Sequence, residues 1–117
     1  MSTKKYDLED RLVSFAGDTI LFLNDLPNNQ AGSNLNGQLT RSATSTALNF
    51  GESQGAESKK DQIHKLGIVL KELKESRVAF KILAYINYGE SDKRSYLLQE
   101  CGELIAIVAT IIRNKKH

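Results

Sequence analysis

The side chains best suited to specific polar chemistry lie in one short segment, QLTRSATSTALNFGES, at positions 38–53. They recur every three or four residues, so they share one face of a helix. This face carries short amides and hydroxyls with one guanidinium and one carboxylate. Such a composition is unusual for a solvated helix face, because Ser, Thr and Asn compete with the helix backbone for hydrogen bonds. The members are Gln38, Arg41, Ser45, Asn49 and Glu52.

We interpret this stripe, together with Glu75 of a later segment, as a hydrogen-bonding seam between helices or between subunits, and call it the polar seam. Arg41 supplies a rigid fork of donors, and Glu52 or Glu75 is expected to accept from it. Ser45 and Asn49 then satisfy backbone or neighbouring polar groups. Buried polar groups of this kind can fix helix register and assembly state. The alternative is that Arg41 and Glu52 are exposed and unpaired.

A second set of candidate residues is basic. The net charge is +2, yet residues 1–58 hold 4 basic and 7 acidic side chains, whereas residues 59–117 hold 12 basic and 7 acidic ones. The basic residues of the second half recur on one side of a helix and again at the C-terminus: Lys60, Lys71, Lys74, Lys81, Arg113, Lys115 and Lys116. They are candidates for salt-sensitive phosphate contacts with RNA or DNA. The alternative is an ordinary solvated face, and without interleaved aromatic residues a stacking platform for single strands is not supported.

The remaining chemistry-bearing residues give little support to catalysis. His64 and His117 have no His or Cys partner at metal-ligand spacing, and no Glu-x-x-His pair of a di-iron bundle is present. No glycine-rich phosphate loop precedes a helix, and no Ser has a His–Asp system to activate it. Cys101 is the only cysteine and lies in an apolar helical pattern, which is typical of a core residue. We predict no catalytic residue, no cofactor and no metal site.

Four segments with a 3.6-residue apolar period must position these residues. We predict helices over about 7–25, from Ser33 or Asn34 to 51–55, over about 56–86 and over about 93–113. Short connections between them favour an all-α, up-down-up-down antiparallel four-helix bundle. The whole chain, 1–117, is expected to be a single domain.

Turn signals separate the four segments. Asp7 is expected to cap the first helix, and Ser58 is a possible internal cap of the third. Gly89 is expected to end the third helix, and Ser91 or Asp92 to cap the fourth.

The third predicted helix carries a second apolar strip, more than a right angle away from its main apolar stripe. A helix of a four-helix bundle needs only one apolar face, and exposed apolar strips usually mark a contact surface. We therefore predict self-association; the alternative is a bundle whose fourth helix is tightly covered by loops. The strip, which also includes Glu75, consists of Ile68, Ala79, Ile82 and Ile86.

Neither end of the sequence suggests a membrane protein. The first residues, MSTKKYDLEDRL, lack the apolar region of a signal peptide. The longest apolar run, LIAIVAT, is far shorter than the ~20 residues that span a bilayer. A cytoplasmic protein without a membrane partner is expected.

The opening segment, with the following SKKDQIHKLGIVLKELKES, resembles the bacterial four-helix-bundle proteins encoded in intervening sequences of 23S ribosomal RNA genes. Those proteins carry Gln-Leu-x-Arg-Ala-Ala, then Ser-Ile-x-x-Asn-Ile-Ala-Glu-Gly, then a Ser-Lys-x-Glu-Phe helix with a later Glu. The resemblance covers most of the chain. The matching positions are Gln38, Leu39, Arg41, Ala43, Ser45, Asn49, Glu52, Lys59 and Glu75. The departures are Ser42, Phe50, Gly51, Ser53 and Gln62.

The resemblance implies a four-helix bundle that assembles into a ring, with a homopentamer as first choice and no settled biochemical activity. A related group, the accessory variability proteins of diversity-generating retroelements, has a similar fold and forms pentameric barrels that bind a reverse transcriptase and nucleic acid. Fold alone does not transfer that function. Two hypotheses follow: a non-enzymatic homo-oligomer with an unknown protein partner, or an RNA- or DNA-binding accessory protein that uses the basic face and the C-terminal tail. An enzyme is the least supported.

Overall fold

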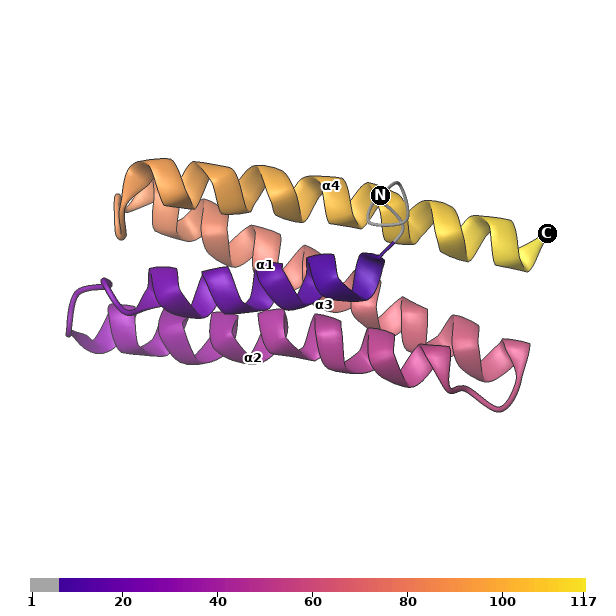
Figure 1. Ribbon diagram of the computed structural model, residues 1–117. Coiled ribbons are helices and arrows are strands. Elements are labelled where there is room, and N and C mark those ends of the chain that lie inside the picture. Colours follow the sequence, from indigo (N-terminus) through magenta and orange to yellow (C-terminus); the bar gives the residue numbers. More distant parts are fainter. Residues whose placement is uncertain (1–6) are drawn as a thin grey trace.

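The computed structural model describes residues 7–117, which form four α-helices and no strand (Figure 1). Helix α1 spans Leu8–Leu23, α2 spans Gln30–Gln54, α3 spans Lys59–Tyr85 and α4 spans Ser91–Lys116. Each helix reverses the direction of the one before it. Helix α2 packs most extensively on α3, and α1 touches α2 and, more weakly, α4, so α1 and α3 lie diagonally opposite. The predicted up-down-up-down bundle is confirmed.

The first and third helices begin at side-chain caps. The Asp7 carboxylate accepts from the Asp10 N–H at 3.1 Å, as predicted. The Ser58 hydroxyl accepts from the Asp61 N–H at 3.0 Å, and α3 begins directly after it at Lys59. Ser58 is therefore the N-terminal cap itself and not an internal cap of a helix that starts earlier.

Helix α2 begins at Gln30, about one turn before the predicted Ser33 or Asn34. Its cap is Asn29, whose side chain accepts from the Gly32 N–H at 2.8 Å. The Asn- and Gly-rich composition suggested a loop. Gly32 is instead a buried helical residue. The position needs glycine because a Cβ there would collide with a backbone carbonyl of the preceding turn.

The residue that terminates α3 is Asn87 and not the predicted Gly89. Asn87, at φ 58°, adopts the left-handed conformation, and its N–H donates to the Ala84 carbonyl at 3.2 Å. The Tyr88 N–H donates to the Leu83 carbonyl at 2.9 Å, which completes a Schellman motif. Asn tolerates this conformation because its short polar side chain bonds locally. Gly89 lies two residues beyond and has a different role.

The cap of α4 also differs from the prediction. The Glu90 carboxylate accepts from the Lys93 N–H at 2.9 Å and from the Asp92 N–H at 3.0 Å. Both hydrogen bonds lower the pKa of Glu90, and the bond from the Asp92 N–H has the larger effect. Ser91 and Asp92 are the first helical residues and not caps, and the helix continues to Lys116 instead of ending near position 113.

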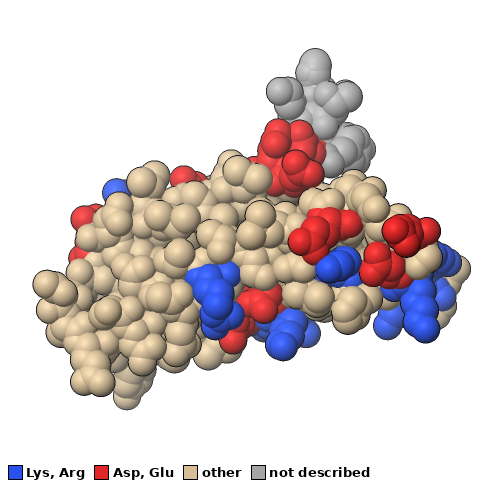
Figure 2. All heavy atoms as spheres, turned by 90° about the horizontal axis from the view of Figure 1, so that it is seen from below, with Lys and Arg blue, Asp and Glu red and all other residues tan. Residues whose placement is uncertain are grey.

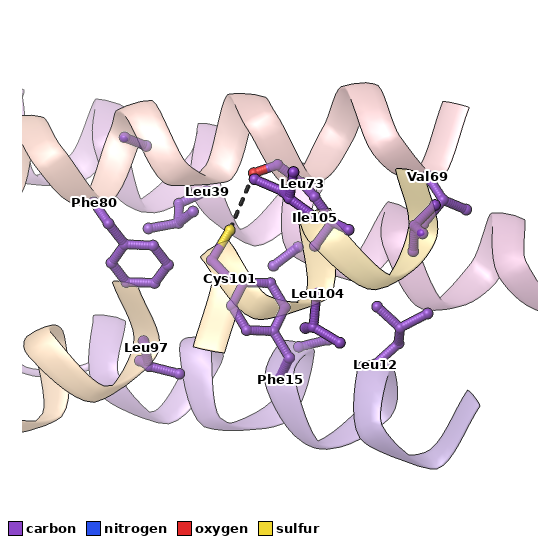
Figure 3. Close-up of a cluster of buried hydrophobic side chains, with 14 of the residues drawn as sticks. Leu12, Phe15, Leu39, Val69, Leu73, Phe80, Leu97, Cys101, Leu104 and Ile105 are labelled. Carbon is purple, nitrogen blue, oxygen red and sulfur yellow. Dashed lines mark hydrogen bonds between the residues drawn. The ribbon is translucent and has the colours of Figure 1, made fainter. Parts of the chain in front are cut away.

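One apolar core holds the four helices together. Phe80 of α3 lies between two rings of α1, with centroid distances of 6.3 Å to Phe15 and 5.8 Å to Phe22. Figure 3 shows the middle of this core, where Leu12, Leu39 and their neighbours point inward from all four helices.

Cys101 is part of this core, as predicted. Its side chain is fully buried, and Sγ donates to the Leu73 carbonyl at 3.1 Å (Figure 3). Burial raises the pKa of the thiol to about 12, so that the reactive thiolate is scarce at neutral pH.

Helix α4 is also long and apolar enough to cross a membrane by length and composition, with a mean hydropathy of 1.4 over its best window. Leu97, Cys101, Leu104 and Val108 of α4 face the interior of the bundle.

Candidate functional site

The amides and the hydroxyl of the polar seam form hydrogen bonds within α2. The Asn49 amide donates to the Ser45 carbonyl at 3.0 Å and to its hydroxyl at 2.9 Å. The Gln38 amide donates to the Asn34 side chain at 3.0 Å. These side chains are therefore satisfied by their own helix, and only the charged members of the seam reach α3.

Arg41 lies beside two carboxylates of α3. Its Nη1 atom is 3.7 Å from a Glu75 oxygen and 3.9 Å from a Glu72 oxygen, which is too long for direct hydrogen bonds. The Arg41 side chain is 60% exposed. Glu52 does not take part, because it accepts from the Lys65 ammonium at 2.7 Å. The seam in this chain thus includes three ion pairs between α2 and α3, two of them made by Arg41.

Glu72 was not among the predicted seam residues. Its side chain is only 13% exposed, and its nearest cation, Arg41 Nη1, lies beyond hydrogen-bond distance. Burial raises its pKa, the adjacent Glu75 raises it further, and Arg41 opposes the shift. Glu72 stands four residues before the buried Ser76, on the side of α3 that meets α2, and only the packed helices show this.

Short hydroxyl side chains form the buried contact between α2 and α3. The Ser42 and Ser76 hydroxyls are 2.7 Å apart and both are fully buried. Thr46 and Ser53 are also buried and donate to backbone carbonyls one turn earlier in α2. Helix α2 is therefore rich in Ser and Thr partly because small hydroxyls allow close packing on α3 without leaving a polar atom unpaired.

A groove of about 260 Å³ runs between α2 and α3. It brings Gln38 and Glu75 of the polar seam together with Ala79 and Ile82 of the second apolar strip. Val78, 55% exposed, stands at its rim.

The second apolar strip is only half exposed. Ile82 is 44% exposed and Ile86 is 38% exposed. Ala79 is buried and Ile68 is half-buried, because both lie on the side of α3 that turns toward α2. The prediction of one continuous exposed strip is wrong, although its C-terminal half does reach the surface.

Charge is scarce on this side of the bundle. Helix α2 has two charged residues in its whole length, Arg41 and Glu52. Figure 2 shows a broad area without Lys, Arg, Asp or Glu over the start of α2 and the end of α3. A large neutral surface around an apolar groove is typical of a protein contact.

The predicted basic residues do not form one patch. Lys60, Lys71, Lys74 and Lys81 are exposed along α3, and none forms an ion pair with a described residue. The tail residues Arg113, Lys115 and Lys116 occupy the last turn of α4, at the end of the bundle where α3 begins and Lys81 is most distant (Figure 1). Within residues 7–117, no group of three His, Cys, Asp or Glu side chains is placed to hold a metal ion.

Two comparisons identify the family. Residues 4–110 match the family described as 23S rRNA-intervening sequence protein. The chain belongs to this family. Among solved structures, a protein of unknown function from the S23 ribosomal protein family of Bacteroides thetaiotaomicron VPI-5482 is similar at 28% identity and a TM-score of 0.82. The similarity covers 89% of this chain and 96% of that one. Among curated proteins, none matches the chain.

The family match agrees with the resemblance seen in the segment at positions 38–53. The function of this 23S rRNA-intervening sequence protein is not given by its relatives, and neither the family nor the similar structure indicates a catalytic class.

Proposed function

We propose that this 23S rRNA-intervening sequence protein is a non-enzymatic bundle that assembles with copies of itself. The observation that carries the proposal is the apolar surface of α3 near its groove with α2, where Val78, Ile82 and Tyr85 stay 55%, 44% and 92% exposed. Fully burying an Ile contributes roughly 1.5–3 kcal/mol, so a partner gains much by covering this face. A closed ring does so with one repeated contact. Five subunits is the number that the sequence resemblance suggests.

Light scattering coupled to size exclusion tests this proposal. The native protein should have a mass several times the 13.0 kDa of one chain. Ile82→Glu should dissociate it, because it places a charge in the covered face. Ser95→Glu, on the exposed side of α4, is the matched control and should keep the native mass. A native mass of one chain would contradict the proposal.

A second candidate function is binding to RNA or DNA. It is favoured by the four exposed Lys side chains of α3, which have no ion-pair partner among the described residues. Lys71→Glu with Lys74→Glu should lower the affinity for ribosomal RNA fragments and flatten its salt dependence. Lys93→Glu, on α4 and outside the basic face of α3, is the control. Binding that survives the double change and high salt would exclude this face.

A further inference from the structure

The outward face of α1 combines acidic and apolar side chains. Leu21 is 66% exposed, and Asp18 and Asp25 flank it along the chain. The single basic residue of α1, Arg11, turns away to bond Glu100 of α4. This face was not predicted from the sequence, because no single residue on it is unusual.

A groove of about 350 Å³ adjoins this face between α1 and α4. Leu21 and the 60% exposed Tyr96 line it, with Asp18 at its edge. Lys93 is also present, beside Asp92, so these two charges balance. The excess charge at the groove is therefore negative.

The outward face of α3 also has an exposed apolar residue between two charged side chains, but here the charges are positive. Lys74 and Lys81 flank Val78, and Tyr85 follows one turn later. The acidic residues of this half of α3, Glu72 and Glu75, turn toward Arg41 of α2. The excess charge of this face is therefore positive.

The two faces also match in spacing. Lys74 and Lys81 are seven residues apart in the sequence, as are Asp18 and Asp25. Lys74, Val78 and Lys81 all lie in α3 and fall within about 60° of arc at 100° per residue. Asp18 and Leu21 lie in the last turns of α1, and Asp25 follows in the turn just after the helix ends at Leu23. One face laid on the other can therefore bring opposite charges together around Val78 and Leu21.

The exposed apolar side chains are concentrated on the same two helices. Of the nine large apolar side chains that are exposed among the described residues, six belong to α1 or α3 and a seventh, Ile86, is the C-terminal cap of α3. The six are Val13, Ile20, Leu21, Val78, Ile82 and Tyr85. Because α1 and α3 are diagonal neighbours, their faces point away from each other and cannot meet within one chain.

We propose that the α3 face of one copy docks on the α1 face of the next, with Lys74 and Lys81 paired to Asp18 and Asp25 around Val78 and Leu21. The contact is heterologous, so each copy offers both surfaces and the assembly grows into a ring or a filament. This inference rests on the proposed self-assembly and specifies its interface.

Charge exchange tests the pairing. The α3 variant, Lys74→Glu with Lys81→Glu, and the α1 variant, Asp18→Lys with Asp25→Lys, should each shift the mass by light scattering toward the 13.0 kDa monomer. The quadruple variant, in which both faces are reversed, should regain the native mass. An equimolar mixture of the two double variants should also form species heavier than either alone, because every contact in an alternating arrangement is then between opposite charges.

The controls are Glu57→Lys and Lys116→Glu, both exposed and outside the two faces, which should keep the native mass. Circular dichroism shows whether each variant folds. If the quadruple variant does not fold, the mixture of the two double variants still tests the pairing. A native oligomer that either double variant leaves intact would overturn the interface but leave self-assembly standing. A monomeric native protein would overturn both. Double variants that dissociate without rescue by exchange or by mixing would also overturn the pairing.

Discussion

Two arginines show how the surroundings of a residue decide its contribution. Arg11 of α1 binds Glu100 of α4 through two bonds of 2.7 and 2.8 Å, and Glu103 through a third of 2.8 Å. Its pKa is raised, chiefly by the hydrogen bond to Glu100, whose side chain is 13% exposed. Arg41 approaches its carboxylates no closer than 3.7 Å and is mostly in water. The two arginines should therefore differ in their effect on folding.

We expect Arg11→Ala to lower the free energy of unfolding by about 1–3 kcal/mol, because it leaves the half-buried Glu100 carboxylate without its bidentate partner. Arg41→Ala should cost about 0–1 kcal/mol, the range of exposed ion pairs. Urea unfolding monitored by circular dichroism at low protein concentration measures both. Equal losses would mean that the geometry of the two sites does not control their energetics.

Glu72 should make stability depend on pH. Its pKa lies above the ordinary 4.5 in the folded state, mainly because of burial. The folded state therefore binds this proton more tightly than the unfolded state. The stabilisation is complete below the ordinary pKa and is lost as the pH rises through the raised one. Glu72→Gln should consequently raise the melting temperature at pH 7 and converge with the native protein at low pH. Glu57→Gln, in the exposed connection between α2 and α3, is the control; a native-like profile for Glu72→Gln would contradict the assignment.

Residue-level predictions succeeded where type and period agreed. Cys101 fell in the core because apolar neighbours recur around it, and Glu75 lies near Arg41. The sequence could not show that Glu52 prefers Lys65, since that choice depends on how α2 and α3 are offset. It also could not show that the Ser42 and Ser76 hydroxyls meet, because that contact joins positions 34 residues apart.

At the scale of elements, the helices were predictable and their ends less so. Periodicity extends over many residues, whereas a cap depends on a single side chain. The sequence favoured Gly89 as the end of α3 and Ser91 or Asp92 as the cap of α4, because these types are common there. The chain uses Asn87 and Glu90 instead. Because Asn87 and Glu90 provide these two ends, Gly89 does not act as a cap and packs against the ring of Phe22.

Gly89 should be difficult to replace. It adopts φ +85°, and a Cβ there would collide with the ring of Phe22. Gly89→Ala should therefore destabilise the protein by more than about 1 kcal/mol, from strain and displaced packing. Gly102→Ala is the matched control: it lies inside α4 with open space around it, so it should stabilise by about 0.5–1 kcal/mol. Thermal unfolding compares them, and a neutral Gly89→Ala would contradict the packing role.

At the scale of the molecule, the surface was harder to predict than the fold. The sequence showed an apolar excess on α3 but gave no sign that Ile20 of α1 is 38% exposed. Val13 and Leu21, still more exposed, do not look unusual singly either. Whether these residues can form a docking surface depends on α1 and α3 lying diagonally opposite, and only the packed bundle shows that arrangement.

The two candidate functions compete for the same side chains, which leads to a final prediction. If Lys74 and Lys81 pair with carboxylates of the next copy, phosphates can reach them only when the assembly opens. Single-stranded RNA added in excess at low salt should therefore lower the mass of the protein assembly, and high salt should release the RNA as its counterions return. Sedimentation followed separately at protein and RNA wavelengths measures this. Lys115→Gln with Lys116→Gln tests the alternative. RNA that binds the intact assembly, and is lost in this tail variant, would place nucleic acid on the end of α4 and leave the α3 face to self-assembly alone.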